Sequence, residues 1–278
     1  MAGWPVHAPV AGRSDSPRAL SVADWRQRWS RWRRARTLER RPIPDGLWRT
    51  TLERFPFLSE RSADAVGRLR ELATLFLAQK EFSGAGGLQV TDEMAVAIAA
   101  QACVPILELG LDCYDGFVGI VVHPDAVVAR RETVDEAGVV HRYTEELSGE
   151  AMDGGPLMLS WRDVAEGGSS AAWGYNVVIH EFVHVLDMHV GRAGMPTRVQ
   201  DADWSRRLAD EYDRFTQRVD AREETLVDPY GAEAIEEFFA VSAEAFFVAG
   251  HDLLEEEPAL YALLAAFFRQ DPAHSLPT

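Results

Sequence analysis

The apolar residues of this chain recur mostly at helical spacing. In the segment 62–82, Ala65, Leu69, Leu72 and Phe76 fall three or four positions apart, as they do on the buried face of an amphipathic helix. The same pattern predicts further helices over 91–105, 176–188, 203–219, 232–248 and 253–268. The chain is therefore expected to be mostly helical.

Short apolar runs indicate a small β-sheet among these helices. Residues 117–122 are rich in β-branched side chains and are bounded by Gly and Pro, which is typical of a buried strand. The segments 139–143 and 156–161 have a similar character and stand among Gly, Asp and Ser. The whole pattern predicts an α+β fold, mostly helical with a small mixed β-sheet, in a single domain over 21–278.

The N-terminal region differs from the rest of the chain. Residues 1–20 are rich in Pro, Gly, Ser and Ala without periodicity, so we expect a disordered leader. Residues 21–41 interleave arginines with Trp25, Trp29 and Trp32, a pattern also found in segments that bind nucleic acids or membrane surfaces. Because the three tryptophans share one helical face, we favour a basic helix docked on the protein, or a mobile arm.

Composition excludes several classes of protein. An apolar content of 47% in 278 residues fits a globular protein with a sizeable core, and no apolar run approaches the roughly 18 residues of a membrane span. The formal charge of −16 repels phosphate backbones, so direct nucleic-acid binding is not expected. Two cysteines and no visible secretory signal favour the cytoplasm.

A His-Glu-x-x-His motif lies in the predicted helix 176–188. Its histidines, His180 and His184, are four residues apart, so both imidazoles share one helix face and can bind one Zn²⁺. Glu181 lies about 100° further round the helix, within reach of a zinc-bound water. Zinc lowers the pKa of such a water to about 7, and a carboxylate can then take its proton. The motif predicts a hydrolytic zinc site.

The surroundings of the motif favour a real site over a chance match. The apolar residues 177–179 place it in a buried helix, where two histidines and a glutamate need a shared partner. Asp187 lies three residues after His184 on the same face and can accept the second ring N–H of a ligand histidine. The alternative for Asp187 is an ordinary surface carboxylate at the end of the helix.

A catalytic zinc takes three protein ligands, so the motif requires one more. The metzincin pattern fails, because Asp187 and Val190 stand where it needs Gly and His. The other source is a carboxylate from a second helix, and the phenylalanine-rich segment 232–248 carries Glu237 and Glu244 on one face. We choose Glu237 as the third ligand.

These motifs lie in longer stretches that resemble the Mlc titration factor A family of bacterial zinc peptidases. The stretches are HEFVHVLDM at 180–188, Asp-Pro-Tyr at 228–230, EFFAV at 237–241, RPIPDGLW at 41–48, LFLAQKEFSGAGGLQVTDEMAVAIAAQACVPILELGLDCY at 75–114 and VVHPDAVV at 121–128. They cover most of the chain. The resemblance implies a zincin-like metallopeptidase of the gluzincin type, with a site related to that of the anthrax lethal factor catalytic domain.

The resemblance also implies roles for single residues. The zinc ligands would be His180, His184 and Glu237, and Glu181 would be the general base. The family has a tyrosine seven residues before the ligand glutamate, here Tyr230, whose hydroxyl would stabilise the oxyanion of the reaction. From the residues alone, Tyr230 is better interpreted as part of a turn.

The sequence thus predicts a cytoplasmic zinc metallopeptidase that hydrolyses peptide or protein substrates, and the resemblance adds an aminopeptidase preference. The resemblance also implies a regulatory alternative, in which the protein sequesters the transcriptional repressor Mlc and so modulates glucose phosphotransferase uptake genes. The two functions are compatible. A zinc-bearing protein without activity is disfavoured, because ligands, base and oxyanion donor are all present.

Overall fold

The computed structural model describes residues 22–134, 140–147, 149–151, 155–170, 174–189 and 202–274. The leader expected at 1–20 lies outside these residues. The chain divides into two compact units, Met1–Arg36 and Thr37–Thr278. The described part of the first unit belongs to helix α1 (Val22–Arg40), which continues into the second. The single domain expected over 21–278 stays a prediction.

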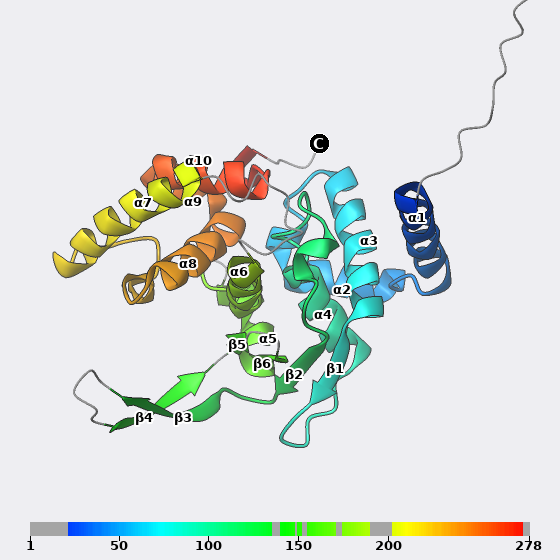
Figure 1. Ribbon diagram of the computed structural model, residues 1–278, viewed down its shortest axis with the longest axis horizontal. Helices are drawn as coiled ribbons and strands as arrows, with labels where there is room; N and C mark the ends of the chain where they lie inside the picture. The colour runs from blue at the N-terminus through cyan, green and yellow to red at the C-terminus, as the bar shows by residue number, and fades with distance from the viewer. Residues whose placement is uncertain are drawn as a thin grey trace, which may run out of the picture. The chain divides into compact units, whose positions relative to one another are not determined.

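The second unit is α+β and mostly helical, as the periodicity predicts (Figure 1). Its α-helices are α2 (Asp45–Arg54), α3 (Ala63–Gln79), α4 (Asp92–Ala102), α5 (Trp161–Ser170), α6 (Val177–His189), α7 (Ala202–Asp220), α8 (Ile235–Val248), α9 (Gly250–Glu256) and α10 (Pro258–Phe268). Short 3₁₀ helices are η1 (Pro56–Leu58), η2 (Leu111–Tyr114), η4 (Pro229–Ala232) and η5 (Pro272–His274). Within the described residues, none of the helices combines the length and apolarity needed to cross a bilayer.

The small sheet is mixed, again as predicted. Its strands lie in the order β1 (Glu81–Gly84), β2 (Gly119–His123), β6 (Leu157–Ser160) and β5 (Gly149–Ala151). The pairs β1–β2 and β2–β6 are parallel, and β5–β6 is antiparallel. Helix α4 lies in the connection between β1 and β2, since parallel neighbours need a crossover. A separate antiparallel pair consists of β3 (Val127–Val134) and β4 (Val140–Leu147).

Several predicted helices have different bounds in the structure; for example, α4 ends at Ala102 and α8 begins at Ile235. The helix expected over 62–82 ends at Gln79, and Phe82 lies in β1 because the segment pairs with β2. The helix expected over 253–268 is divided into α9 and α10 at Glu257. The residue before a proline is disfavoured in the α conformation, and Pro258 follows this break.

Helix α5 was not predicted, and it begins at Trp161, inside the expected strand 156–161.

Helix α6 lies at the centre of the second unit, in contact with α4, α8, β5 and β6 (Figure 1). Its Phe182 is fully buried among three aromatic rings. The ring centroids of Tyr114, Phe76 and Phe117 lie 4.9, 5.5 and 5.8 Å from that of Phe182. A buried phenylalanine contributes roughly 1.5–3 kcal/mol by removal from water, so this contact anchors the motif helix.

Helix α8 packs on α6 and is also in contact with α7 and α10. Its Phe238 lies 4.9 Å from Phe215 of α7 between ring centroids, and Phe239 lies 5.1 Å from Phe267 of α10. The two phenylalanines are buried and follow directly after Glu237 in the sequence. The packing of this helix therefore sets where the Glu237 carboxylate lies.

Candidate metal centre

The two motif histidines lie one turn apart on α6 and face the same space. Their ring centroids are 4.7 Å apart, and the Nε2 atom of His180 lies 3.1 Å from that of His184. Asn176 holds the start of the helix, because its Oδ1 accepts a hydrogen bond from the Ile179 N–H at 3.0 Å. Its Nδ2 donates to Gln101 Oε1 of α4 at 2.7 Å.

Glu237 of α8 completes a three-residue cluster with these histidines. Its Oε2 lies 3.1 Å from His180 Nε2 and 3.4 Å from His184 Nε2. Ligand atoms at zinc–ligand distances of roughly 2.0–2.1 Å around a tetrahedral zinc ion are separated by about 3.3 Å. The three separations therefore match one face of such a tetrahedron.

The state of the Glu237 oxygen also fits a metal ion. Oε2 is buried and, among the described residues, makes no hydrogen bond of regular geometry, although two imidazole nitrogens lie within 3.4 Å. A buried carboxylate oxygen without a donor is costly, and a cation shared with both imidazoles would satisfy it. Two imidazole nitrogens and one carboxylate oxygen are a ligand set used by catalytic zinc.

A second carboxylate of α8, that of Glu244, contacts the other ring nitrogen of His180. Glu244 Oε1 lies 2.7 Å from His180 Nδ1, the ring nitrogen that faces away from Glu237. Its Oε2 accepts a hydrogen bond from the backbone N–H of Asn176. Glu244 is 1% exposed, so these two contacts account for a carboxylate that would otherwise be buried without partners. The sequence places Glu244 on the same helix face as Glu237 but does not indicate that His180 is its partner.

The charges in the metal-free site are strongly coupled. Burial alone would raise the pKa of Glu237, but the nearby imidazoles of His180 and His184 outweigh this effect and lower the pKa to about 2. Burial alone would lower the pKa of His180, but the carboxylates of Glu237 and Glu244 raise it well above its usual value. An imidazole must be neutral to bind a metal, so metal binding would release this proton.

Glu181 is the buried acid of the motif. It is 6% exposed, and its burial raises its pKa to about 7, with the two histidines opposing the shift. A carboxyl group with a pKa near neutrality can both accept and return a proton under ordinary conditions. Its position next to His180 in the sequence and its buried environment fit the role of a general base.

Tyr230 and Asp187 both lie near the cluster. The ring of Tyr230, in η4, has its centroid 6.4 Å from that of His180, and the side chain is 42% exposed. The backbone N–H of Tyr230 donates to Asp228 Oδ1 at 2.9 Å, which fixes the turn. Asp187 is partly buried, which raises its pKa, and the nearby His184 opposes this rise. The structure therefore brings His180, His184 and Glu237 into one cluster with Tyr230 beside His180, and the hydrogen bond expected from a ligand histidine to Asp187 stays a prediction.

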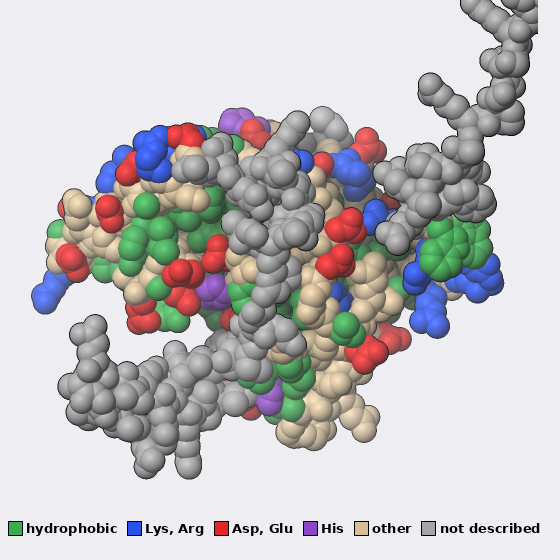
Figure 2. Space-filling model, viewed as in Figure 1, with side chains coloured by type: hydrophobic (Ala, Val, Ile, Leu, Met, Phe, Trp, Pro, Cys, Tyr) green, Lys and Arg blue, Asp and Glu red, His purple; other side chains and the backbone are tan. Residues whose placement is uncertain are grey.

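Several acidic side chains lie around α8. On the face shown in Figure 2, they lie beside the surface of a histidine, whereas α7 carries both acidic and basic side chains. Glu236 and Glu237 both stand in the first turn of α8. A site surrounded by carboxylates attracts cations and positively charged groups of a ligand.

Comparison with known proteins extends the match beyond these residues. The model of the glucose-regulated metallo-peptidase M90 family matches residues 29–269. Mlc titration factor A of Salmonella arizonae is 35% identical over 238 residues, which cover 84% of this chain and 94% of that protein. Mlc titration factor A of Serratia proteamaculans is 35% identical over 231 residues, or 81% and 87% of the two chains. An uncharacterized protein of Synechocystis sp. is 36% identical over 250 residues, or 88% and 90%.

Proposed function

The chain belongs to the glucose-regulated metallo-peptidase M90 family, and on this premise we propose that it is a zinc-dependent peptidase with His180, His184 and Glu237 as its metal ligands. The observation that carries the proposal is the convergence of the three ligand atoms at 3.1–3.4 Å from one another. The mixed nitrogen and oxygen donors favour zinc over magnesium or calcium, which prefer oxygen alone. One ion per chain is expected.

The side chains around the ligands then have separate roles. When bound, zinc lowers the pKa of a coordinated water to about 7 and polarises the scissile carbonyl. Glu181 takes the proton from the attacking water and returns it to the leaving amine. Tyr230, which is partly exposed and has its ring beside His180, donates a hydrogen bond to the oxyanion. Glu244 positions His180, and we assign a similar supporting role to Asp187 beside His184.

A digest of a peptide library tests the proposed activity. The purified protein should cleave peptides, cleavage should stop on addition of a chelator, and added zinc should restore it. The Glu181→Gln variant should retain the metal and lose about 10²- to 10⁴-fold in rate, since general-base catalysis contributes that much. A chelator-resistant digest, or an active Gln variant, would contradict the proposal.

We further propose an aminopeptidase preference. Carboxylates around α8, among them Glu236, attract the protonated N-terminus of a peptide. The prediction is that peptides with a free α-amino group are cleaved faster than the same peptides after N-acetylation. Equal rates for the two forms would remove the preference and leave the peptidase assignment intact.

A regulatory function is the second candidate, because the relatives from Salmonella arizonae and Serratia proteamaculans are named Mlc titration factor A. The proposal for this chain is that it binds a repressor of the Mlc type and modulates glucose uptake genes in the cytoplasm, where its free cysteines Cys103 and Cys113 would stay reduced. Binding should survive Glu181→Gln, whereas hydrolysis should not. A pull-down with the repressor that fails for both the wild type and this variant would contradict this function.

A further inference from the structure

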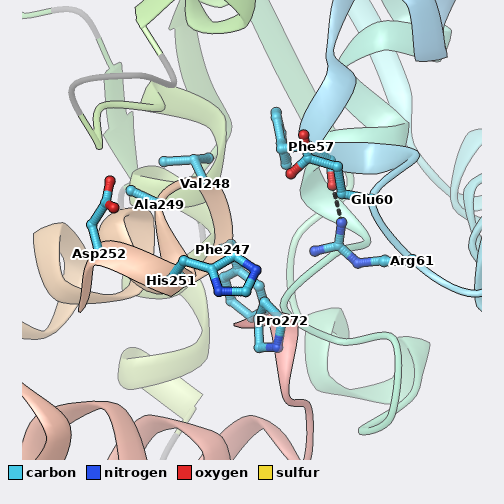
Figure 3. A pocket seen from close by; sticks show the side chains of 10 residues that line it. Phe57, Glu60, Arg61, Phe247, Val248, Ala249, His251, Asp252 and Pro272 are labelled. Carbon is cyan, nitrogen blue, oxygen red and sulfur yellow. Dashed lines mark hydrogen bonds between the residues drawn. The ribbon is translucent and has the colours of Figure 1, made fainter. Parts of the chain in front are cut away.

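A cavity lies at the C-terminal end of α8, away from Glu237 of the metal centre. Its volume is about 430 Å³, and its walls come from η1 and the residues after it, from the α8–α9 junction and from Pro272 (Figure 3). Phe247, one of the lining residues, follows Glu237 by ten positions, which corresponds to about 15 Å along the helix axis. The cavity is therefore separate from the proposed catalytic site.

Arg61 brings a buried positive charge to this cavity. The residue is 5% exposed, and its Nη1 donates to the carbonyl oxygen of Phe57. Its Nη2 is buried and has no hydrogen-bond partner among the described residues. Burial lowers the pKa of Arg61 to about 10, partly opposed by Glu60, so the guanidinium stays protonated at neutral pH. A charged donor left unpaired in the wall of a cavity points to an anionic group of a ligand.

Acidic side chains line both sides of the same cavity. Figure 3 shows Arg61 and Glu60 on one side and Asp252 with Val248 and Ala249 on the other. Val248 is the last residue of the 14-residue helix α8, whose C-terminal end carries the negative pole of the helix dipole. A simple anion would be repelled by these groups, whereas a ligand with a separate positive group would be attracted by both sides.

The middle of the cavity is partly apolar. Phe57, Phe247 and Pro272 line it together with the imidazole of His251. Its volume lies within the range of small-molecule sites, toward the lower end. The ligand that fits these walls is small, carries one negative and one positive group, and has an apolar part between or beside them.

We propose that this cavity binds a zwitterion, an α-amino acid or a short peptide, with its carboxylate on Arg61 and its ammonium group toward Asp252. Such ligands are products of peptide hydrolysis, but the binding site does not depend on the peptidase activity. Its location at the C-terminal end of α8 places it on the helix whose first turn carries Glu237.

Calorimetric titration of the full chain with L-phenylalanine tests this site. Phenylalanine has both charges and an apolar side chain, and no peptidase can hydrolyse it. It should bind saturably at one site per chain, whereas phenylalaninamide and N-acetylphenylalanine, which each lack one charge, should bind about tenfold or more weakly, as expected for loss of a charge-assisted hydrogen bond. Glycyl-phenylalanine, titrated in parallel into Glu181→Gln so that it is not hydrolysed, distinguishes the sources, because tighter binding of the dipeptide would assign the site to peptides.

Variants then locate the binding. Arg61→Gln and Asp252→Asn should each weaken phenylalanine binding by about tenfold or more. Arg68→Gln, at an exposed arginine of α3 that pairs with Glu108 at 2.5 Å, is the matched control and should bind normally. If Arg61→Gln does not fold, the exposed Asp252→Asn variant and the three ligands still decide the outcome. Absence of saturable binding at millimolar concentrations, equal binding of the two singly charged analogues, or wild-type binding by Asp252→Asn would overturn the proposal.

Discussion

Glu244 is the residue whose replacement most specifically probes the architecture around the metal ligands. Its Oε1 lies 2.7 Å from His180 Nδ1, and its Oε2 accepts the backbone N–H of Asn176 at the start of the motif helix. In Glu244→Gln, one of these acceptor oxygens becomes an NH₂ donor. The amide can therefore satisfy the imidazole or the backbone N–H, but not both.

The magnitude follows from this geometry. A distance of 2.7 Å is typical of a charge-assisted hydrogen bond, and carboxylates that orient a metal-bound histidine contribute about 10- to 100-fold to metal affinity. At about 1.4 kcal/mol for each factor of ten, Glu244→Gln should weaken zinc binding by roughly 1.4–2.7 kcal/mol. Glu244→Ala, which leaves both donors unpaired, should also lower the free energy of unfolding by about 1–3 kcal/mol for each of them.

Competition with a chromogenic chelator measures the zinc affinity, and urea unfolding of the metal-free protein measures stability separately. Ser242→Ala is the matched control on the same helix, because the Ser242 hydroxyl is buried and makes no hydrogen bond among the described residues. Ser242→Ala should bind zinc with wild-type affinity and should be at least as stable as the wild type. Wild-type zinc affinity in Glu244→Gln would refute a role for Glu244 in positioning His180.

Three further predictions concern other parts of the chain. Tyr230→Phe should lower kcat by about 10²- to 10³-fold with little change in KM, zinc content or melting temperature. A wild-type turnover number in this variant would show that Tyr230 has only a structural role in the turn. Phe182→Ala should reduce the free energy of unfolding in urea by about 3–5 kcal/mol, because the removed ring is fully buried; a loss below about 1 kcal/mol would contradict the packing described for α6. Although Trp29 and Trp32 are 61% and 52% exposed, the chain should not bind DNA tightly through α1. Salt-sensitive, sub-micromolar DNA binding that is lost on removal of residues 1–41 would contradict this prediction.

The sequence predicted those elements whose signals are local. Helices α3 and α4 begin where Ser62 and Thr91 accept hydrogen bonds from the backbone N–H groups of Ala65 and Met94, as their cap residues indicate. Strand β1 has no such signal, because only Phe82 of its four residues is even partly buried. Its conformation comes from pairing with β2, which lies more than thirty residues later in the chain.

The same distinction applies to the site. The spacing of His180 and His184 is local and places them together on any helix. Glu237 was chosen as the third ligand because a carboxylate in a phenylalanine-rich, buried helix needs a partner. The sequence shows that the helix is buried, but not which atoms the carboxylate meets. Which of Glu237 and Glu244 meets which imidazole nitrogen depends on how α6 packs on α8, and no periodicity encodes that contact. Arg61 likewise gave no sequence signal, because its unpaired nitrogen becomes evident only once the cavity around it has formed.

The central claim is that two histidines of one helix and one glutamate of another hold the catalytic metal. Metal analysis of the purified wild type, Glu237→Ala and Glu236→Ala tests it most directly, since Glu236 is the neighbouring acid in the same helix turn and is not part of the cluster. The account predicts one zinc ion per chain in the wild type and in Glu236→Ala, and loss of zinc with loss of peptide hydrolysis in Glu237→Ala. A full complement of zinc in Glu237→Ala, or its loss in Glu236→Ala alone, would contradict the assignment.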